Sequence, residues 1–152
     1  MKPLLFALSL ALVVGCGEKH DHASAGGHSH HHEPPHGGTA VTLGNEEGHL
    51  EFVRDAATGK LTAYLLNPHM TGFWRTPVTQ FEIAARVAGK TETLSFKAVA
   101  NAATGETIGD TAQFEAQAEW LKATSRFDAT LIELALPGKS FKAVSFNFPK
   151  GN

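Results

Sequence analysis

The sequence contains a single cysteine, Cys16, among its 152 residues. One cysteine allows neither a disulfide framework nor a cysteine-based zinc site within the chain. Common catalytic motifs are missing as well: there is no Gly-x-Ser-x-Gly elbow and no phosphate-binding loop. The aromatic residues Phe73, Trp74 and Trp120 could line a ligand surface, but burial in the core is their more frequent fate. We therefore expect that the chain is not an enzyme.

Long hydrophobic runs and a strong charge of one sign are also scarce. The apolar stretch at residues 4–14 is shorter than the roughly 20 residues that a helix needs to span a bilayer. The formal net charge is −2, so no basic patch argues for binding to nucleic acid. We expect no nucleic-acid partner.

The N-terminus has the layout of a signal peptide, because Lys2 precedes the apolar stretch and Val-Val-Gly-Cys follows at residues 13–16. These four residues resemble the lipobox of bacterial lipoproteins, in which the cysteine is acylated by chains such as palmitate and becomes the mature N-terminus. We expect residues 1–15 to be removed and Cys16 to carry the lipid. Gly17 at the next position resembles the sorting signal for the outer membrane, facing the periplasm. The alternatives are an ordinary secretory peptide or an uncleaved anchor.

Composition changes sharply near residue 38. Residues 17–38 contain no Leu, Ile, Val, Phe, Tyr or Trp and are rich in Gly, Ser, Ala, Pro and His. A segment with no apolar side chains to bury cannot offset the entropy lost on ordering. We expect residues 16–37 to form a flexible tether and residues 38–152 to form one folded domain.

Alternation of apolar and polar residues dominates from residue 39 onward and indicates β-strands. The alternating stretches are residues 49–52, 61–65, 81–87, 93–98, 130–136 and 141–148. In the fifth stretch, Ile132, Leu134 and Leu136 are expected to share the core face. Hairpin turns are predicted at residues 55–59, 89–90 and 137–139, each of which contains Gly, with Asp in the first and Pro in the third.

Two further features complete the predicted fold. The turn phrase Ala-Ala-Thr-Gly occurs at residues 56–59 and 102–105, and we interpret both copies as turns rather than as a duplication. The apolar residues of the stretch 113–123 fit both strand and helix spacing. We expect a short strand around Phe114 and a helical turn near Trp120. Seven or eight short antiparallel strands with one short helical turn favour a mainly β, immunoglobulin-like β-sandwich, with a small barrel as the main alternative.

Histidine is abundant: the chain has nine, and seven of them fall in the tether. The seven are His20, His22, His28, His30, His31, His32 and His36. Imidazole is the commonest side-chain ligand for zinc, nickel and copper(II), and a flexible chain can place several around one ion. Asp21 and Glu33 could add oxygen ligands. We expect the tether to bind divalent transition metal ions; the alternative is a hydrophilic spacer that happens to be rich in histidine.

His49 and His69 are the only histidines of the predicted folded domain, and they suggest a second metal site together with His36. His49 lies opposite the face of Leu50 and Phe52, so we expect it to be exposed, while His69 is expected in a turn at the end of the next strand. Three histidines with an open fourth position would form a labile zinc or copper(II) site. The alternative is that His49 is a solvated strand residue and His69 a loop residue with its own hydrogen bond.

Three stretches carry a resemblance: residues 34–41, 49–53 and 59–66. They are similar to a β-rich segment of small bacterial lipoproteins that have a histidine-rich N-terminal tether, and to a segment near the N-terminus of some periplasmic adaptor subunits of heavy-metal efflux pumps. The resemblance implies envelope localisation and a link to divalent metals, with His36 and His49 as the matching positions. The chain lacks the long coiled-coil hairpin of an adaptor.

Two functions follow from these patterns. The first is an envelope lipoprotein, bound to the membrane through the lipid on Cys16, that binds zinc, nickel or copper(II) for buffering or delivery. The second is a non-catalytic β-module that binds a protein partner or has a structural role on a lipid-anchored spacer. The sequence does not identify that protein partner.

Overall fold

The computed structural model describes residues 33–152. The predicted signal peptide and Cys16 lie outside the described residues, and so do the first six tether histidines. Those six are His20, His22, His28, His30, His31 and His32. The predictions for lipidation and for metal binding by these residues therefore remain predictions.

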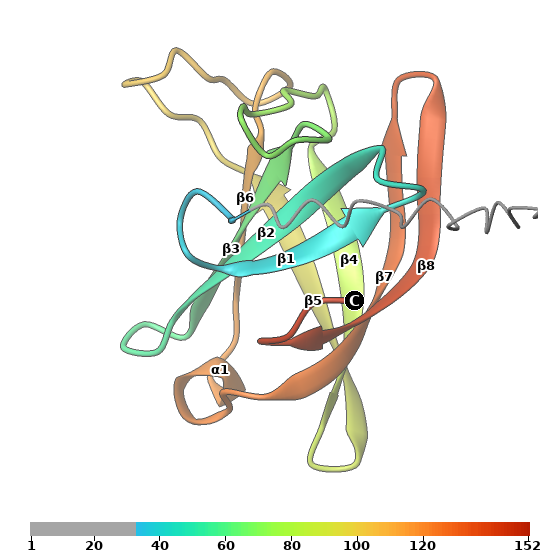
Figure 1. The fold of residues 1–152 in the computed structure, drawn as a ribbon. Coiled ribbons are helices and arrows are strands. Elements are labelled where there is room, and N and C mark those ends of the chain that lie inside the picture. The colour runs from blue at the N-terminus through green and yellow to red at the C-terminus, as the bar shows by residue number, and fades with distance from the viewer. Residues whose placement is uncertain (1–32) are drawn as a thin grey trace, which may run out of the picture. The chain divides into compact units, whose positions relative to one another are not determined.

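Within residues 33–152 the fold consists of eight strands and one short helix (Figure 1). They are β1 (Thr39–Leu43), β2 (Gly48–Asp55), β3 (Lys60–Leu66), β4 (Gln80–Val87), β5 (Lys90–Ala98), β6 (Gln113–Gln117), α1 (Trp120–Ala123), β7 (Phe127–Leu136) and β8 (Lys139–Phe148). All eight strands belong to one antiparallel sheet in the order β1-β2-β3-β6-β5-β4-β7-β8. The predicted mainly β, antiparallel fold with one helical turn is thereby confirmed.

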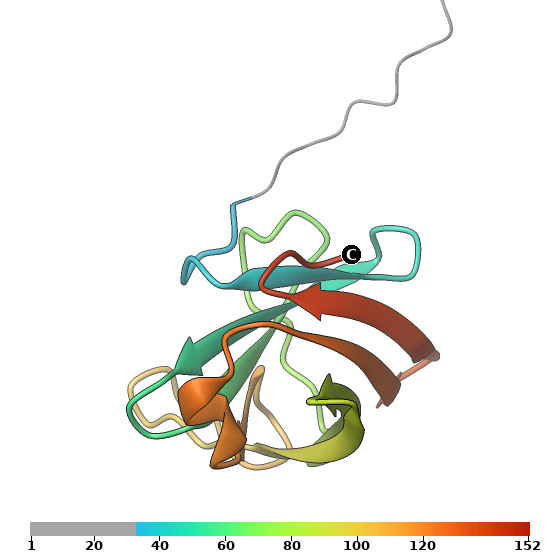
Figure 2. The same cartoon turned by 90° about the horizontal axis from the view of Figure 1, so that it is seen from below.

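The arrangement of the strands is closer to the small barrel than to a sandwich of two separate sheets. The single sheet curls until its edge strands β1 and β8 approach each other (Figure 2). At this seam Asn152 bridges to β1: its Oδ1 accepts from the Thr42 N–H at 2.8 Å, and its Nδ2 donates to the Thr42 carbonyl oxygen at 3.2 Å. Alternation alone cannot distinguish the two arrangements, because both bury one face of every strand.

The predicted hairpin turns are confirmed, and the two Ala-Ala-Thr-Gly turns are built alike. Asp55 Oδ1 accepts from the Ala57 N–H at 2.9 Å, and Asn101 Oδ1 accepts from the Ala103 N–H at 3.1 Å. Gly59 and Gly105 close these turns with φ of 72° and 69°, which side chains with a Cβ rarely adopt. Local turn chemistry therefore accounts for the repeated phrase.

The core fills the space inside the curled sheet, and one predicted core residue is absent from it. Ile132 is 47% exposed, whereas its neighbour Leu131 is fully buried. The pairing of β4 with β7 shifts by one residue at this point, since Glu82 pairs with Glu133 but Ile83 pairs with Leu131. Ile132 is the extra residue of a β-bulge, so the alternation reverses there and the prediction that Ile132 faces the core is wrong.

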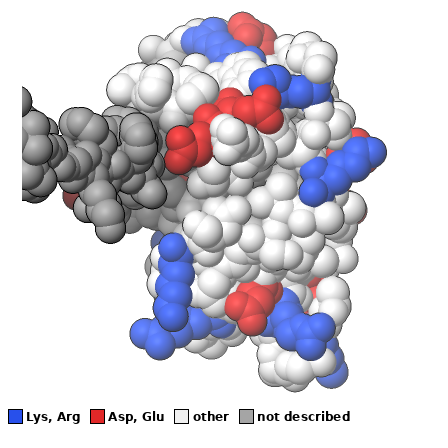
Figure 3. Space-filling view, turned by 45° about the vertical axis from the view of Figure 1, so that its right-hand side comes forward, with Lys and Arg blue, Asp and Glu red and all other residues white. Residues whose placement is uncertain are grey.

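Charged side chains are dispersed on the molecular face in Figure 3, with both signs interspersed. Some form ion pairs, such as Lys142 with Glu133 at 3.0 Å and Lys139 with Glu47 at 3.1 Å. Exposed pairs of this kind contribute about 0–1 kcal/mol each. Within residues 33–152, no helix has the length and apolar character needed to cross a bilayer.

Candidate functional site

His36 is attached to the outer face of β2 by the carboxylate of Glu51. Its ring Nδ1 lies 2.8 Å from Glu51 Oε2, while the backbone N–H groups of His36 and Gly38 both donate to Glu51 Oε1, at 2.8 and 2.9 Å. The Glu51 side chain is fully buried, whereas the His36 side chain is 34% exposed. The buried carboxylate thus holds the end of the predicted tether against the folded domain.

The local sequence explains how the chain reaches this position. The Gly37 N–H donates to the Pro34 carbonyl oxygen at 3.0 Å, which closes a turn, and Gly37 itself has a φ of 65°. A Cβ on Gly38 would lie only 2.6 Å from the Phe52 carbonyl oxygen. Only glycine lets the backbone approach β2 this closely, so the Gly37-Gly38 pair brings His36 to Glu51.

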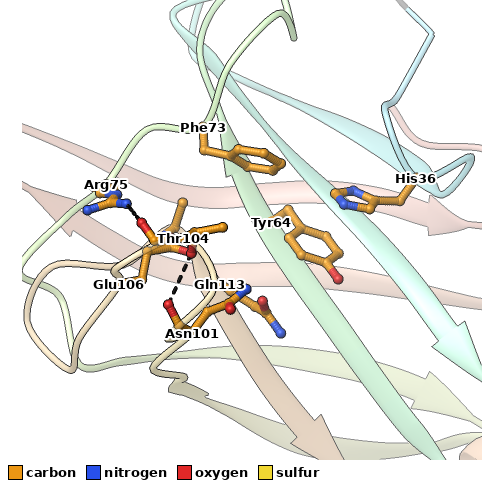
Figure 4. A pocket seen from close by; sticks show the side chains of 9 residues that line it. His36, Tyr64, Phe73, Arg75, Asn101, Thr104, Glu106 and Gln113 are labelled. Atoms are coloured by element: carbon orange, nitrogen blue, oxygen red, sulfur yellow. Dashed lines mark hydrogen bonds between the residues drawn. The ribbon is translucent and has the colours of Figure 1, made fainter.

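The His36 ring forms part of an aromatic wall. It stacks on Tyr64 of β3, with ring centroids 3.8 Å apart and an interplanar angle of 14°. Phe73, in the segment after β3, is tilted against both rings, with centroids 5.8 Å from His36 and 6.2 Å from Tyr64. These rings line a pocket of about 280 Å³, with the polar side chains of Asn101, Glu106 and Gln113 on its other side (Figure 4).

Glu106 is a buried carboxylate that lines this pocket. Its Oε2 accepts from the Thr104 hydroxyl at 2.6 Å, and its Oε1 accepts from the Ala112 N–H at 2.8 Å. Burial acts to raise the pKa of Glu106, but these hydrogen bonds and the nearby charge of Arg75 outweigh it and leave the pKa below its ordinary value. Arg75 in turn donates to the Thr104 carbonyl oxygen and to Asp110.

The Tyr64 hydroxyl keeps its proton more firmly than an ordinary phenol. Partial burial raises the pKa of Tyr64, and the negative charges of Glu51 and Glu115 raise it further. At neutral pH the hydroxyl is therefore both a hydrogen-bond donor and an acceptor.

His49 is buried, with 4% of its surface exposed, so the prediction that it lies in solvent is wrong. Although it does lie opposite the Leu50 and Phe52 face, the segment after β3 packs against this end of the sheet, where a Cβ on Gly48 would lie 3.0 Å from the Trp74 ring. Phe73 forms a β-bridge with Leu66, the cross-strand partner of His49, and the Trp74 N–H donates to Leu65. The alternation identified the face of His49 but could not reveal its burial, which depends on tertiary packing at this end of the sheet.

The structure does not assemble the predicted three-histidine site. His69 is exposed in the predicted turn, at the same end of the β2–β3 ladder as His49, whereas His36 is held at Glu51. Among residues 33–152, no three histidine, cysteine or acidic side chains lie together in a way that could hold a metal ion. His36 has a carboxylate partner in Glu51 and faces a pocket.

Sequence reasoning missed most of the pocket. It favoured burial in the core for Phe73, Trp74 and Trp120 over a ligand surface. Trp74 and Trp120 do pack against the core, whereas Phe73 lines the pocket. Glu51 and Tyr64 could have been found, because they are neighbours across the β2–β3 ladder on the polar face. Arg75 and Glu106 lie in loops, where the alternation of apolar and polar residues does not predict which way a side chain points.

Comparison with protein-family models, with curated proteins and with solved structures finds no match to this chain. The resemblance to lipoproteins and efflux adaptors therefore remains a prediction. The function has to be argued from the chemistry of the residues themselves.

Proposed function

We propose that the protein is an envelope lipoprotein that binds zinc, nickel or copper(II) for buffering or delivery, and that His36 is the ligand supplied by its folded domain. The observation that carries the proposal is the pairing of His36 with the buried carboxylate of Glu51 at 2.8 Å. His36 is also the last of the seven tether histidines. The lipid on Cys16 would attach the protein to the membrane, facing the periplasm.

The Glu51 carboxylate prepares His36 for metal binding. A carboxylate oxygen accepts hydrogen bonds, so Nδ1 carries the ring proton and Nε2 keeps the lone pair that a metal requires. Histidines that bind metals almost always have such a partner, because it fixes the tautomer and makes the ligating nitrogen more basic. Stacking on Tyr64 also fixes the plane of the ring, so little ordering entropy remains to be lost on binding.

One histidine is not a site, so the remaining ligands must come from the tether. His32 precedes His36 by four residues, and four residues span at most about 14 Å. Chain length alone therefore allows the imidazoles of His30, His31 and His32 to reach an ion at His36 Nε2, at a high effective concentration. Glu33 could add an oxygen ligand.

Isothermal titration of Zn²⁺, Ni²⁺ and Cu²⁺ into the purified protein tests the proposal. We expect saturable binding with micromolar or tighter affinity and a defined stoichiometry. His36→Ala should weaken it at least tenfold, Glu51→Gln by about 10–100-fold through loss of the carboxylate partner, and replacement of the six other tether histidines by serine should abolish it. Circular dichroism should show that each variant is folded.

The matched control is His69→Ala, which removes an exposed histidine of the folded domain away from Glu51 and should leave the affinity unchanged. If His36→Ala also had no effect while the serine replacement abolished binding, the tether alone would capture metal and the role of His36 would be refuted. If His69→Ala weakened binding as much as His36→Ala, a site that includes His69 would be favoured instead.

A further inference from the structure

The pocket between His36, Phe73 and Gln113 has a shape that selects among ligands. Its volume of about 280 Å³ lies just below the roughly 300–1,000 Å³ of sites for drug-sized molecules, so it can hold about one ring. Phe73 is 52% exposed beside it, although large apolar side chains are usually covered. An exposed aromatic ring at a pocket with polar groups opposite is typical of a binding site for a ligand that has one apolar face.

The angles between the rings argue against a flat ligand held between two aromatic plates. Such a slot needs two parallel rings about 7 Å apart, twice the van der Waals stacking distance. His36 and Tyr64 are parallel but already in contact at 3.8 Å. Phe73 is inclined by 41° to His36 and by 53° to Tyr64. The walls therefore form an angled corner, which fits a puckered ring better than a planar one.

The charged groups of the pocket already have hydrogen-bond partners within the protein. Both oxygens of Glu106 accept hydrogen bonds, from Thr104 and from Ala112. Arg75 donates to Asp110 and to the Thr104 carbonyl oxygen. A charged ligand would have to break these interactions, whereas a neutral ligand would leave them intact.

Neutral hydrogen-bonding groups face the same space. Asn101 and Gln113 each use one end of the side-chain amide within the described chain: Asn101 Oδ1 accepts from Ala103, and Gln113 Nε2 donates to Glu115. The opposite ends, Asn101 Nδ2 and Gln113 Oε1, together with the Tyr64 hydroxyl, supply one donor, one acceptor and one group that does both. Such a set matches a ligand edge made of several hydroxyl groups.

We propose that this pocket binds a single neutral pyranose, with the apolar face of the sugar ring against Phe73 and Tyr64 and its hydroxyl groups bonded to Asn101 and Gln113. The pocket shares the His36–Tyr64 wall with the proposed metal ligand, but sugar binding as proposed needs no metal ion. For a single neutral sugar in an open pocket, a dissociation constant on the order of 1–10 mM is expected.

The test is a titration of the ¹⁵N-labelled full-length protein with neutral methyl glycosides of glucose, mannose, galactose and N-acetylglucosamine, followed by NMR. We expect at least one of them to shift the amide signals of Tyr64, Asn101 and Gln113 in a saturable manner. Phe73→Ala should weaken this binding at least tenfold. Asn101→Asp should do so as well, because it keeps the oxygen that accepts from Ala103 and replaces the Nδ2 donor by a negatively charged oxygen that cannot donate.

The matched control is Ile132→Ala, which removes another exposed apolar side chain, on β7 rather than at the pocket, and should leave binding unchanged. The absence of saturable shifts with all four glycosides at 100 mM would refute the proposal. So would equal binding to the Phe73→Ala and Asn101→Asp variants, or tighter binding of planar adenosine than of every glycoside at the same residues.

Discussion

Glu106 shows how hydrogen bonds can keep a buried side chain ionised. Burial raises its pKa, but the Thr104 hydroxyl, the Ala112 N–H, the charge of Arg75 and the Thr111 hydroxyl together lower it below 4.5. The folded state therefore binds a proton less readily than the unfolded chain does. The stabilisation is fully present above the unfolded pKa of about 4.5 and is lost as the pH falls through the folded pKa.

We therefore predict that Glu106→Gln lowers the free energy of unfolding most at pH 7, and that the difference from the original protein shrinks as the pH falls below 4.5. Urea denaturation at pH 7 and at several acidic pH values measures this difference. Glu92→Gln, an exposed position on β5, is the control and should change stability little at any pH. A loss for Glu106→Gln that stays constant down to low pH would contradict the prediction.

At this same scale, the sequence reveals candidate ligands but not their partners. His36 could be identified because histidine is unusual in a spacer and because Gly37-Gly38 follows it. Glu51 could not be assigned as its partner, since 15 residues separate the two and nothing local to either one indicates the contact. Knowledge that residues 36–38 pack against β2 is needed, and this is tertiary information.

At the scale of elements, the sequence predicts the strands but not the irregularities within them. The alternation predicted β4, β5, β7 and β8 with their turns, because each of these strands buries one face. The bulge at Ile132 adds one residue to the strand, but the sequence there still reads as a run of apolar residues. The pattern therefore does not show which of Leu131 and Ile132 faces the core. A second irregularity lies opposite, at Ala143 in β8, where φ is 54°.

Because of the bulge, we expect substitutions at the adjacent residues Leu131 and Ile132 to differ in their effect on stability. Ile132→Thr should change the free energy of unfolding by no more than about 0.5 kcal/mol, as is usual for exposed positions. Leu131→Ala should lower it by about 2–5 kcal/mol, because it leaves a cavity in the core. Chemical denaturation of both variants measures the contrast. The reverse order would mean that the strand alternates without a bulge and that Ile132 faces the core.

At the scale of the whole molecule, the curled sheet must protect two edge strands. A long exposed edge invites pairing with another chain, and Lys residues and irregular backbone discourage it. On β8, Lys139, Lys142 and the left-handed Ala143 have this effect. On β1, Asn152 occupies both backbone groups of Thr42, and Gly151 lies so close that a Cβ there would overlap the Ala40 carbonyl oxygen.

The seam therefore depends on two residues that sequence patterns did not single out. Asn152→Ala removes two hydrogen bonds to Thr42 and should lower the free energy of unfolding by about 1 kcal/mol. Hydrogen exchange at the Thr42 amide should become much faster than at the paired amides of β2.

Gly151→Ala should lower the free energy of unfolding by about 1–3 kcal/mol, because a Cβ at φ 85° is strained and would also overlap the Ala40 carbonyl oxygen. Gly89→Ala is the control: its φ of 79° carries similar strain, but a Cβ there meets open space. If Gly151→Ala cost no more than Gly89→Ala, and Thr42 exchange did not change in Asn152→Ala, the contact between this end of the chain and β1 would not stabilise the barrel.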